Sequence, residues 1–130
     1  MKERILVVDD EKHMRALVGE VLEVEGYTPV YAQTSEEALG IFNQQRQNLA
    51  AVILDIKLGS NESGLDTLLK IRSQDQNKPV ILYTAYDSFQ HDLKSIAADY
   101  YVVKSCDTTE LVQIVHLAVA KNRKHQEENR

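Results

Sequence analysis

Short runs of consecutive apolar residues alternate along the chain with segments of helical periodicity. These runs are Ile5 to Val8, Thr28 to Ala32, Ala51 to Leu54, Val80 to Tyr83 and Tyr100 to Val103, of which the second is a short strand that also contains Thr28 and Pro29. Unbroken apolar runs are typical of strands that are covered on both faces, because a half-exposed strand alternates apolar with polar residues. Strands that alternate with helices favour right-handed crossovers and a parallel sheet. The sequence therefore predicts an α/β fold with five strands and five helices.

The segments between the runs carry apolar residues at spacings of three and four, as the buried face of a helix does. These stripes are Met14, Leu17, Val18, Val21 and Leu22; Ala38, Leu39 and Phe42; Leu65, Leu68 and Leu69; Phe89, Leu93 and Ile96; and Leu111, Ile114, Val115 and Ala118. Gly26 predicts the end of the first helix, and residues 34–37 form a capping box that opens the second. Asp107, with Glu110 three residues later, predicts the start of the last helix.

Proline indicates where one strand lies in the sheet. Pro29 cannot donate a hydrogen bond to a neighbouring strand, so strand 28–32 is expected at an edge. Pro79 precedes the strand that begins at Val80, where a buried strand tolerates it. An edge position for the second strand agrees with the doubly wound order 2-1-3-4-5.

Composition and charge narrow the class of protein. The chain has 130 residues, with 15 Lys and Arg against 20 Asp and Glu, a formal charge of −5. That charge argues against non-specific nucleic-acid binding by this domain. Cys106 is the only cysteine, so an internal disulfide is excluded and a reducing compartment is indicated. With no signal peptide or membrane-spanning run predicted, we expect a cytoplasmic domain over residues 1–121, followed by a polar tail or linker at 122–130.

Polar residues follow directly after the apolar runs. Asp9 and Asp10 follow the first run, Asp55 the third, Thr84 the fourth and Lys104 the fifth. The carboxyl ends of parallel strands share one edge of a sheet, where ligands bind. Carboxylates gathered there repel one another unless a cation joins them, and oxygen ligands select a hard cation such as Mg²⁺. A carboxylate can also act as a nucleophile toward phosphorus.

Each of these residues also has an ordinary structural explanation. Asp9 or Asp10 can cap the first helix, Asp55 can be a loop acid, and Lys104 can be a solvated lysine. Their convergence on one edge of the sheet favours a functional site, because polar groups that meet in one cleft mark such sites.

The same residues lie in motifs that resemble the receiver domains of response regulators in two-component signalling, the CheY-like family with a flavodoxin-like fold. The resemblance covers about Arg4 to Lys121. Its motifs are Val7-Val8-Asp9-Asp10-Glu11, Val52-Ile53-Leu54-Asp55, Leu82-Tyr83-Thr84-Ala85 and Asp99-Tyr100-Tyr101-Val102-Val103-Lys104.

The resemblance implies that Asp55 is a phosphoacceptor. A histidine kinase or a histidine phosphotransfer protein would supply the phosphoryl group. Asp10, Asp55 and the main-chain carbonyl of Lys57 would bind Mg²⁺ directly, and Asp9 would act through a metal-bound water. Large side chains at Lys57 and Tyr86 would hinder an attacking water and lengthen the lifetime of the phosphoryl group.

The resemblance also implies a switch and an output surface. Thr84 and Lys104 would hold the phosphoryl oxygens, and Tyr101 would turn inward as Thr84 moves. The signal would leave through the face of the fourth helix, fifth strand and fifth helix, with Ser88 to Ala98 and Leu111 to Val119 as its helical parts. An output domain, an effector protein or a second, phosphorylation-dependent copy would bind there. Apart from self-catalysed phosphorylation and dephosphorylation, no enzyme activity is implied.

Two features depart from the family pattern. Receivers usually have proline after the lysine, with a cis peptide bond between them, whereas Ser105 follows Lys104 and leaves the geometry of this bond open. After Asp55 the family commonly has a Met-Pro pair and a glycine eight positions on. Here Leu58 and Gly59 occupy the pair, and Gly64 lies nine positions on, which indicates an insertion of one residue.

Three alternatives are less consistent with the residues. A degenerate receiver would fold and bind a partner without being phosphorylated. A Mg²⁺-dependent aspartyl phosphatase typically has a second acid two residues after its nucleophile, where this chain has Lys57. A flavin-binding module of the same topology needs a Ser-, Thr- or Gly-rich phosphate loop after the first strand, which this sequence does not have.

Overall fold

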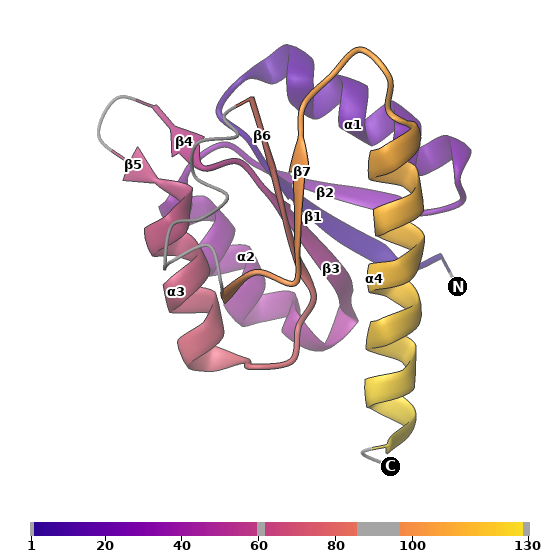
Figure 1. Ribbon diagram of the computed structural model, residues 1–130. Helices are drawn as coiled ribbons and strands as arrows, with labels where there is room; N and C mark the ends of the chain where they lie inside the picture. The colour runs from indigo at the N-terminus through magenta and orange to yellow at the C-terminus, as the bar shows by residue number, and fades with distance from the viewer. Residues whose placement is uncertain (1, 60–61, 86–96, 129–130) are drawn as a thin grey trace.

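The computed structural model describes residues 2–59, 62–85 and 97–128 (Figure 1). The elements are β1 (Arg4–Val8), α1 (Lys12–Val24), β2 (Thr28–Ala32), α2 (Ser35–Gln45), the 3-10 helix η1 (Arg46–Asn48), β3 (Leu49–Leu54), β4 (Lys57–Leu58), β5 (Glu62–Ser63), α3 (Gly64–Gln74), β6 (Val80–Thr84), β7 (Tyr100–Val103) and α4 (Thr109–Glu128). The helix expected around Phe89 to Ile96 lies outside the described residues.

Five strands form one parallel sheet in the order β2-β1-β3-β6-β7. Strands β6 and β7 are the expected fourth and fifth strands, since β4 and β5 pair in a separate antiparallel sheet. The predicted fold class and strand order are therefore confirmed. Strand β2, which contains Pro29, lies at the predicted edge.

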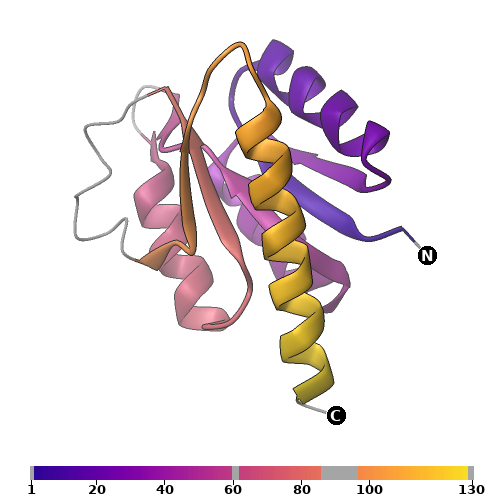
Figure 2. The same cartoon turned by 45° about the vertical axis from the view of Figure 1, so that its right-hand side comes forward.

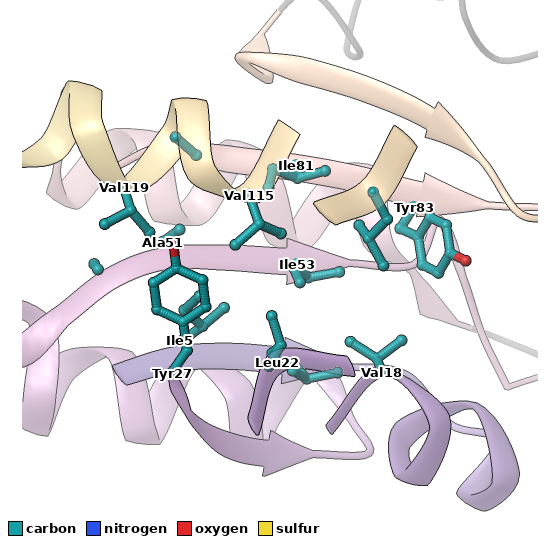
Figure 3. Packing of buried hydrophobic residues seen from close by; sticks show 14 of the residues in the cluster. Ile5, Val18, Leu22, Tyr27, Ala51, Ile53, Ile81, Tyr83, Val115 and Val119 are labelled. Atoms are coloured by element: carbon teal, nitrogen blue, oxygen red, sulfur yellow. The ribbon is translucent and has the colours of Figure 1, made fainter. Parts of the chain in front are cut away.

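Helices cover both faces of the sheet. Helices α1 and α4 lie on one face, and α2 and α3 lie on the other (Figures 1 and 2). Because successive side chains of a strand point to opposite faces, each strand contributes to two cores. The first core joins Ile5 and Ile53 to Leu22 of α1 and Val115 of α4 (Figure 3). The second core joins the other side of the strands to α2 and α3.

Most of the predicted helix signals have the expected local geometry. Gly26, two residues after the end of α1, has a φ of 90°, a conformation that glycine adopts at no steric cost. The hydroxyl of Thr34 accepts a hydrogen bond from the Glu37 N–H at 3.1 Å and so caps α2. Two residues of the predicted stripes, Leu17 and Leu69, lie at the margin of the buried face and are 40% and 41% exposed.

The start of α4 differs from the expectation by one to two residues. Helix α4 begins at Thr109, and the Asp107 carboxylate accepts hydrogen bonds from the N–H and the hydroxyl of Thr109. Asp107 therefore still bonds to the first turn, although it lies before the cap position. At the other end, α4 continues without a break through residue 121 to Glu128 and projects past the sheet (Figures 1 and 2). Asn122, in this continuation, is buried.

Three short elements, η1, β4 and β5, were not predicted. Lys57–Leu58 and Glu62–Ser63, beside and within the polar stretch from Gly59 to Gly64, pair as the short antiparallel strands β4 and β5. This hairpin lies between Asp55 and α3, next to the predicted site. Within the described residues, no helix has both the length and the apolar character that a membrane crossing requires.

Candidate functional site

Three carboxylates meet at the carboxyl edge of the sheet. Asp9 follows β1 and Asp55 follows β3, and these two strands are hydrogen-bonded neighbours. Asp9, Asp10 and Asp55 each offer a carboxylate oxygen within 4.8 Å of the others. Asp9 and Asp55 are buried, whereas Asp10 is exposed. The structure thus brings together the three acids that the sequence placed at strand ends.

Lys104 joins two of these acids. Its ammonium group donates to Asp9 Oδ2 and to Asp55 Oδ2, each at 2.8 Å. The main-chain N–H of Lys104 donates to the carbonyl oxygen of Thr84 at 2.7 Å, which fixes the lysine to the end of β6. Within the described residues no peptide bond is cis, so the Lys104–Ser105 bond is trans. The Lys104 ammonium group thus lies between the two carboxylates in a chain whose Lys104–Ser105 bond is trans.

Burial and pairing act in opposite directions on the ionisation of this cluster. Burial raises the pKa of the Asp9 carboxyl above its ordinary value, although the hydrogen bond from Lys104 opposes that rise. Burial alone would lower the pKa of the Lys104 ammonium, but the hydrogen bonds and charges of Asp55 and Asp9 outweigh it and raise the pKa. Lys104 therefore stays charged and partly neutralises the carboxylates.

Asp9 also stabilises the loop that leads into α1. Its Oδ1 accepts a hydrogen bond from the Glu11 N–H at 2.9 Å, and its carbonyl oxygen accepts one from Arg15 Nη1 at 2.8 Å. Glu11 is the cap residue of α1 and makes no side-chain capping bond itself. Asp9 therefore does not cap α1; it bonds to the cap residue through Oδ1 and to Lys104 through Oδ2.

The β4–β5 hairpin closes one side of the site through its backbone. The Gly59 N–H donates to Asp10 Oδ2 at 3.0 Å, and the Lys57 N–H donates to Asp55 Oδ1 at 3.3 Å. Gly64, the first residue of α3, lies so close to Asp55 that an added Cβ would be 1.9 Å from the Asp55 carbonyl oxygen. Sequence reasoning identified Gly59 and Gly64 as departures in a loop but missed these contacts, because they are made by the main chain.

The two predicted switch residues share one face of the sheet. Thr84 is fully buried at the end of β6, and alternation puts its side chain on the face of Leu82, which belongs to the α2–α3 core. Tyr101 of β7 pairs with Leu82 and is half-buried against the same core. Tyr101 therefore lies next to the strand that carries Thr84, as a coupled pair requires. Tyr86 lies outside the described residues.

A second polar network lies at the opposite end of β6 and β7. Arg72 of α3 donates to Asp99 at 2.5 Å and to the carbonyl oxygens of Ala97 and Lys78 at 2.6 and 2.5 Å. Asp99 also accepts from the Val80 N–H at 2.8 Å. Asp99 begins one of the sequence motifs, but no role of its own was predicted for it. This network holds the starts of two strands whose other ends carry Thr84 and Lys104.

The fold and the site together define a class of protein. It is a doubly wound α/β domain with acids and a lysine at the switch point of its sheet, where such folds bind ligands. The chain belongs to the family of response regulator receiver domains, whose model matches residues 5–116.

Two relatives in sequence differ in how much of their length this chain spans. Sporulation initiation phosphotransferase F of Bacillus subtilis is 34% identical over 113 residues, which are 85% of this chain and 89% of that protein. The probable transcriptional regulatory protein TcrX of Mycobacterium tuberculosis is 36% identical over 110 residues, which are 83% of this chain and 46% of that protein. The chain thus spans most of the first relative and less than half of the second.

Solved structures of relatives have the same fold. The response regulator protein TrrA of Thermotoga maritima, in complex with Mg²⁺-BeF, is 44% identical, with a TM-score of 0.85 over 89% of this chain and 98% of that chain. TrrA in complex with the histidine kinase ThkA is 43% identical, with a TM-score of 0.82 over 89% of this chain and 97% of that chain.

Proposed function

We propose that this receiver domain is a phosphoacceptor switch in which Asp55 takes a phosphoryl group from a phosphohistidine donor. The observation that carries the proposal is the position of Lys104, whose ammonium group lies 2.8 Å from both Asp55 and Asp9. A fixed cation beside a carboxylate nucleophile can neutralise the charge that gathers there when a phosphoryl group arrives. The proposal concerns this domain alone.

The residues at the sheet edge fit a Mg²⁺ ion. The three carboxylates lie within 4.8 Å of one another and offer only hard oxygen donors, which Mg²⁺ prefers. Asp10, Asp55 and the main-chain carbonyl of Lys57 would hold the ion directly, with Asp9 acting through a water. Bound there, Mg²⁺ would supply positive charge that the single lysine cannot provide for three acids and a phosphoryl group.

The transfer itself makes modest demands on the protein. A carboxylate oxygen of Asp55 forms a bond to phosphorus as the P–N bond to the donor imidazole breaks, and the electron pair returns to the imidazole nitrogen, which is then protonated. Lys104 moves its hydrogen bond from the Asp55 carboxylate to a phosphoryl oxygen. The domain catalyses this transfer and the later hydrolysis, which Lys57 and Tyr86 would slow by hindering water.

The signal leaves the site through a new hydrogen bond of the Thr84 hydroxyl. A phosphoryl group on Asp55 offers the Thr84 hydroxyl a strong acceptor, and Tyr101, on the same face of the sheet, turns inward as Thr84 moves. Phosphorylation shifts an existing equilibrium only by its differential interaction with the two states. The changed surface would be that of β7, α4 and the segment from Ser88 to Ala98.

The comparisons support the kinds of partner. TrrA, which this chain resembles, has been solved in complex with a histidine kinase, and the relative TcrX is a longer regulatory protein. We therefore propose a histidine kinase or phosphotransfer protein as donor, and an output domain, effector or second copy as receiver of the signal. Residues 1–121 would form the cytoplasmic receiver domain, and residues 122–130 would lead from it.

The test is the intact mass of the protein after incubation with a small-molecule phosphodonor, with and without Mg²⁺. The expected result is the gain of one phosphoryl group that requires Mg²⁺ and is absent in Asp55→Ala. The matched control is Asp66→Ala, which removes an exposed acid of α3. If folded wild type gains no mass, the domain is a degenerate receiver that acts by binding alone.

A further inference from the structure

The exposed carboxylate of the site has a hydrogen-bond donor outside the family motifs. The Gly59 N–H donates to Asp10 Oδ2 at 3.0 Å, across 49 positions of sequence. We infer that Gly59 is a positioning residue of the Mg²⁺ site, whose N–H holds the Asp10 carboxylate in place before the ion binds. This inference rests on the proposed function and adds to it a determinant of metal affinity.

Asp10 needs such a contact more than the other two acids do. Lys104 pairs with Asp9 and Asp55, which are both buried. Asp10 is exposed and lies beside two like charges, which favour rotation of its side chain into water. Restraining a free side chain when metal binds costs conformational entropy. A charge-assisted hydrogen bond that already restrains it reduces that cost.

The donor is held by the fold. Leu58, the residue before Gly59, is 1% exposed and packs in the α2–α3 core. Strands β4 and β5 pair with each other, and the Gly64 N–H donates to the carbonyl oxygen of Ile56 at 2.5 Å. The hairpin is therefore fixed to the segment after β3 that carries Asp55 and Ile56. Gly59 has a φ of 72°, which suits glycine and directs the chain into this turn.

The identity of the residue at position 59 decides whether the contact exists. Proline, which receivers commonly have at this place, has no N–H and holds φ near −65°. A chain with proline there has no main-chain donor for the acid. The departure that the sequence shows at Gly59 thus creates an interaction with a predicted metal ligand.

Labelling with ¹⁵N-glycine tests the hydrogen bond directly, because the chain has 5 glycines and gives a spectrum that can be assigned by substitution. In metal-free protein, Asp10→Ala should move the Gly59 amide proton upfield and speed its exchange with solvent. Addition of MgCl₂ to wild type should shift the same signal. The Gly40 signal serves as a control, since Gly40 lies in α2 with nothing within 4 Å of an added Cβ.

Mg²⁺ affinity tests the consequence. Gly59→Pro removes the N–H and should weaken Mg²⁺ binding about tenfold, the loss that corresponds to one charge-assisted hydrogen bond. Gly59→Asn keeps the N–H and tolerates a positive φ, so its affinity should stay within about twofold of wild type. Gly26→Pro is the matched control, because Gly26 also has a positive φ and an N–H that donates to a carbonyl, remote from the acids.

The outcomes separate this inference from the proposed function. If wild type binds no Mg²⁺, the proposed metal site fails and the inference fails with it. If wild type binds Mg²⁺ but Gly59→Pro binds it as tightly as Gly59→Asn does, the inference alone is wrong. An unchanged Gly59 amide signal in Asp10→Ala would also overturn it, whatever the metal affinity.

Discussion

Lys104 and Lys78 show how local partners decide the direction in which the pKa of a lysine shifts. Lys104 faces two carboxylates, and its pKa is raised although burial opposes this. Lys78 is 5% exposed and donates to the carbonyl oxygen of Leu49, which carries no full charge. Burial therefore lowers the pKa of Lys78, and the charge of Asp75 offsets this only in part. The first lysine belongs to a charged site, whereas the second joins the start of β6 to β3.

The lowered pKa of Lys78 predicts a dependence of stability on pH. Between its folded pKa and the ordinary value of 10.5, the unfolded chain binds a proton that the folded chain does not. The contribution of Lys78 to the free energy of unfolding therefore rises with pH through that window. The difference in free energy of unfolding between wild type and Lys78→Met should therefore shift in favour of the wild type between pH 7 and pH 10. Urea titrations at each pH measure it.

The control for this prediction is Lys70→Met, which removes an exposed lysine of α3. Its difference from wild type should stay constant over the same range of pH. A constant difference for Lys78→Met as well would show that the burial of Lys78 has no effect on its ionisation.

At the scale of elements, the junction between β3, the hairpin and α3 depends on the size of one residue. A Cβ at Gly64 would lie 1.9 Å from the Asp55 carbonyl oxygen, and main-chain atoms cannot move aside as a flexible side chain can. Gly64→Ala should therefore lower the free energy of unfolding by about 2–4 kcal/mol, as strain in a packed site does. Chemical denaturation measures this loss.

Gly40→Ala provides the matched comparison. Gly40 lies within α2, is exposed, and has nothing within 4 Å of an added Cβ. Alanine has the higher helix propensity, so this substitution should raise stability by about 0.5–1 kcal/mol. Equal effects of the two substitutions would mean that close contact at Gly64 is not what requires glycine there.

The elements show which parts of the molecule are predictable from sequence. The five strands and the convergence of Asp9, Asp55 and Lys104 follow from apolar runs and strand ends, which are local signals, whereas the strand order came from the doubly wound pattern, with which Pro29 agrees. The β4–β5 hairpin does not, because its two-residue strands are too short to have a period. The contact between Gly59 and Asp10 joins main chain to side chain across 49 positions, and no pattern of residue types encodes it.

At the scale of the whole molecule, the acidic cluster makes the metal-free fold less stable than it can be. Asp9 carries a raised pKa because burial disfavours its charge, and Lys104 pairs with only two of the three acids. An ion that binds only the folded chain adds stability by mass action. The thermal stability of the domain should therefore report on occupancy of the site at the end of the sheet.

Mg²⁺ at about 100 times its Kd should raise the free energy of unfolding by about 2.7 kcal/mol. For a domain of this length that corresponds to an increase in Tm of roughly 5–10 °C, measured against the same protein in EDTA. Asp10→Asn should lose this increase, because a neutral amide replaces a charged ligand while the acceptor for the Gly59 N–H is kept. Glu36→Gln, which removes an exposed acid of α2, should keep it. An equal increase in Tm for Asp10→Asn would place the ion elsewhere on the molecule and would contradict the carboxylate site.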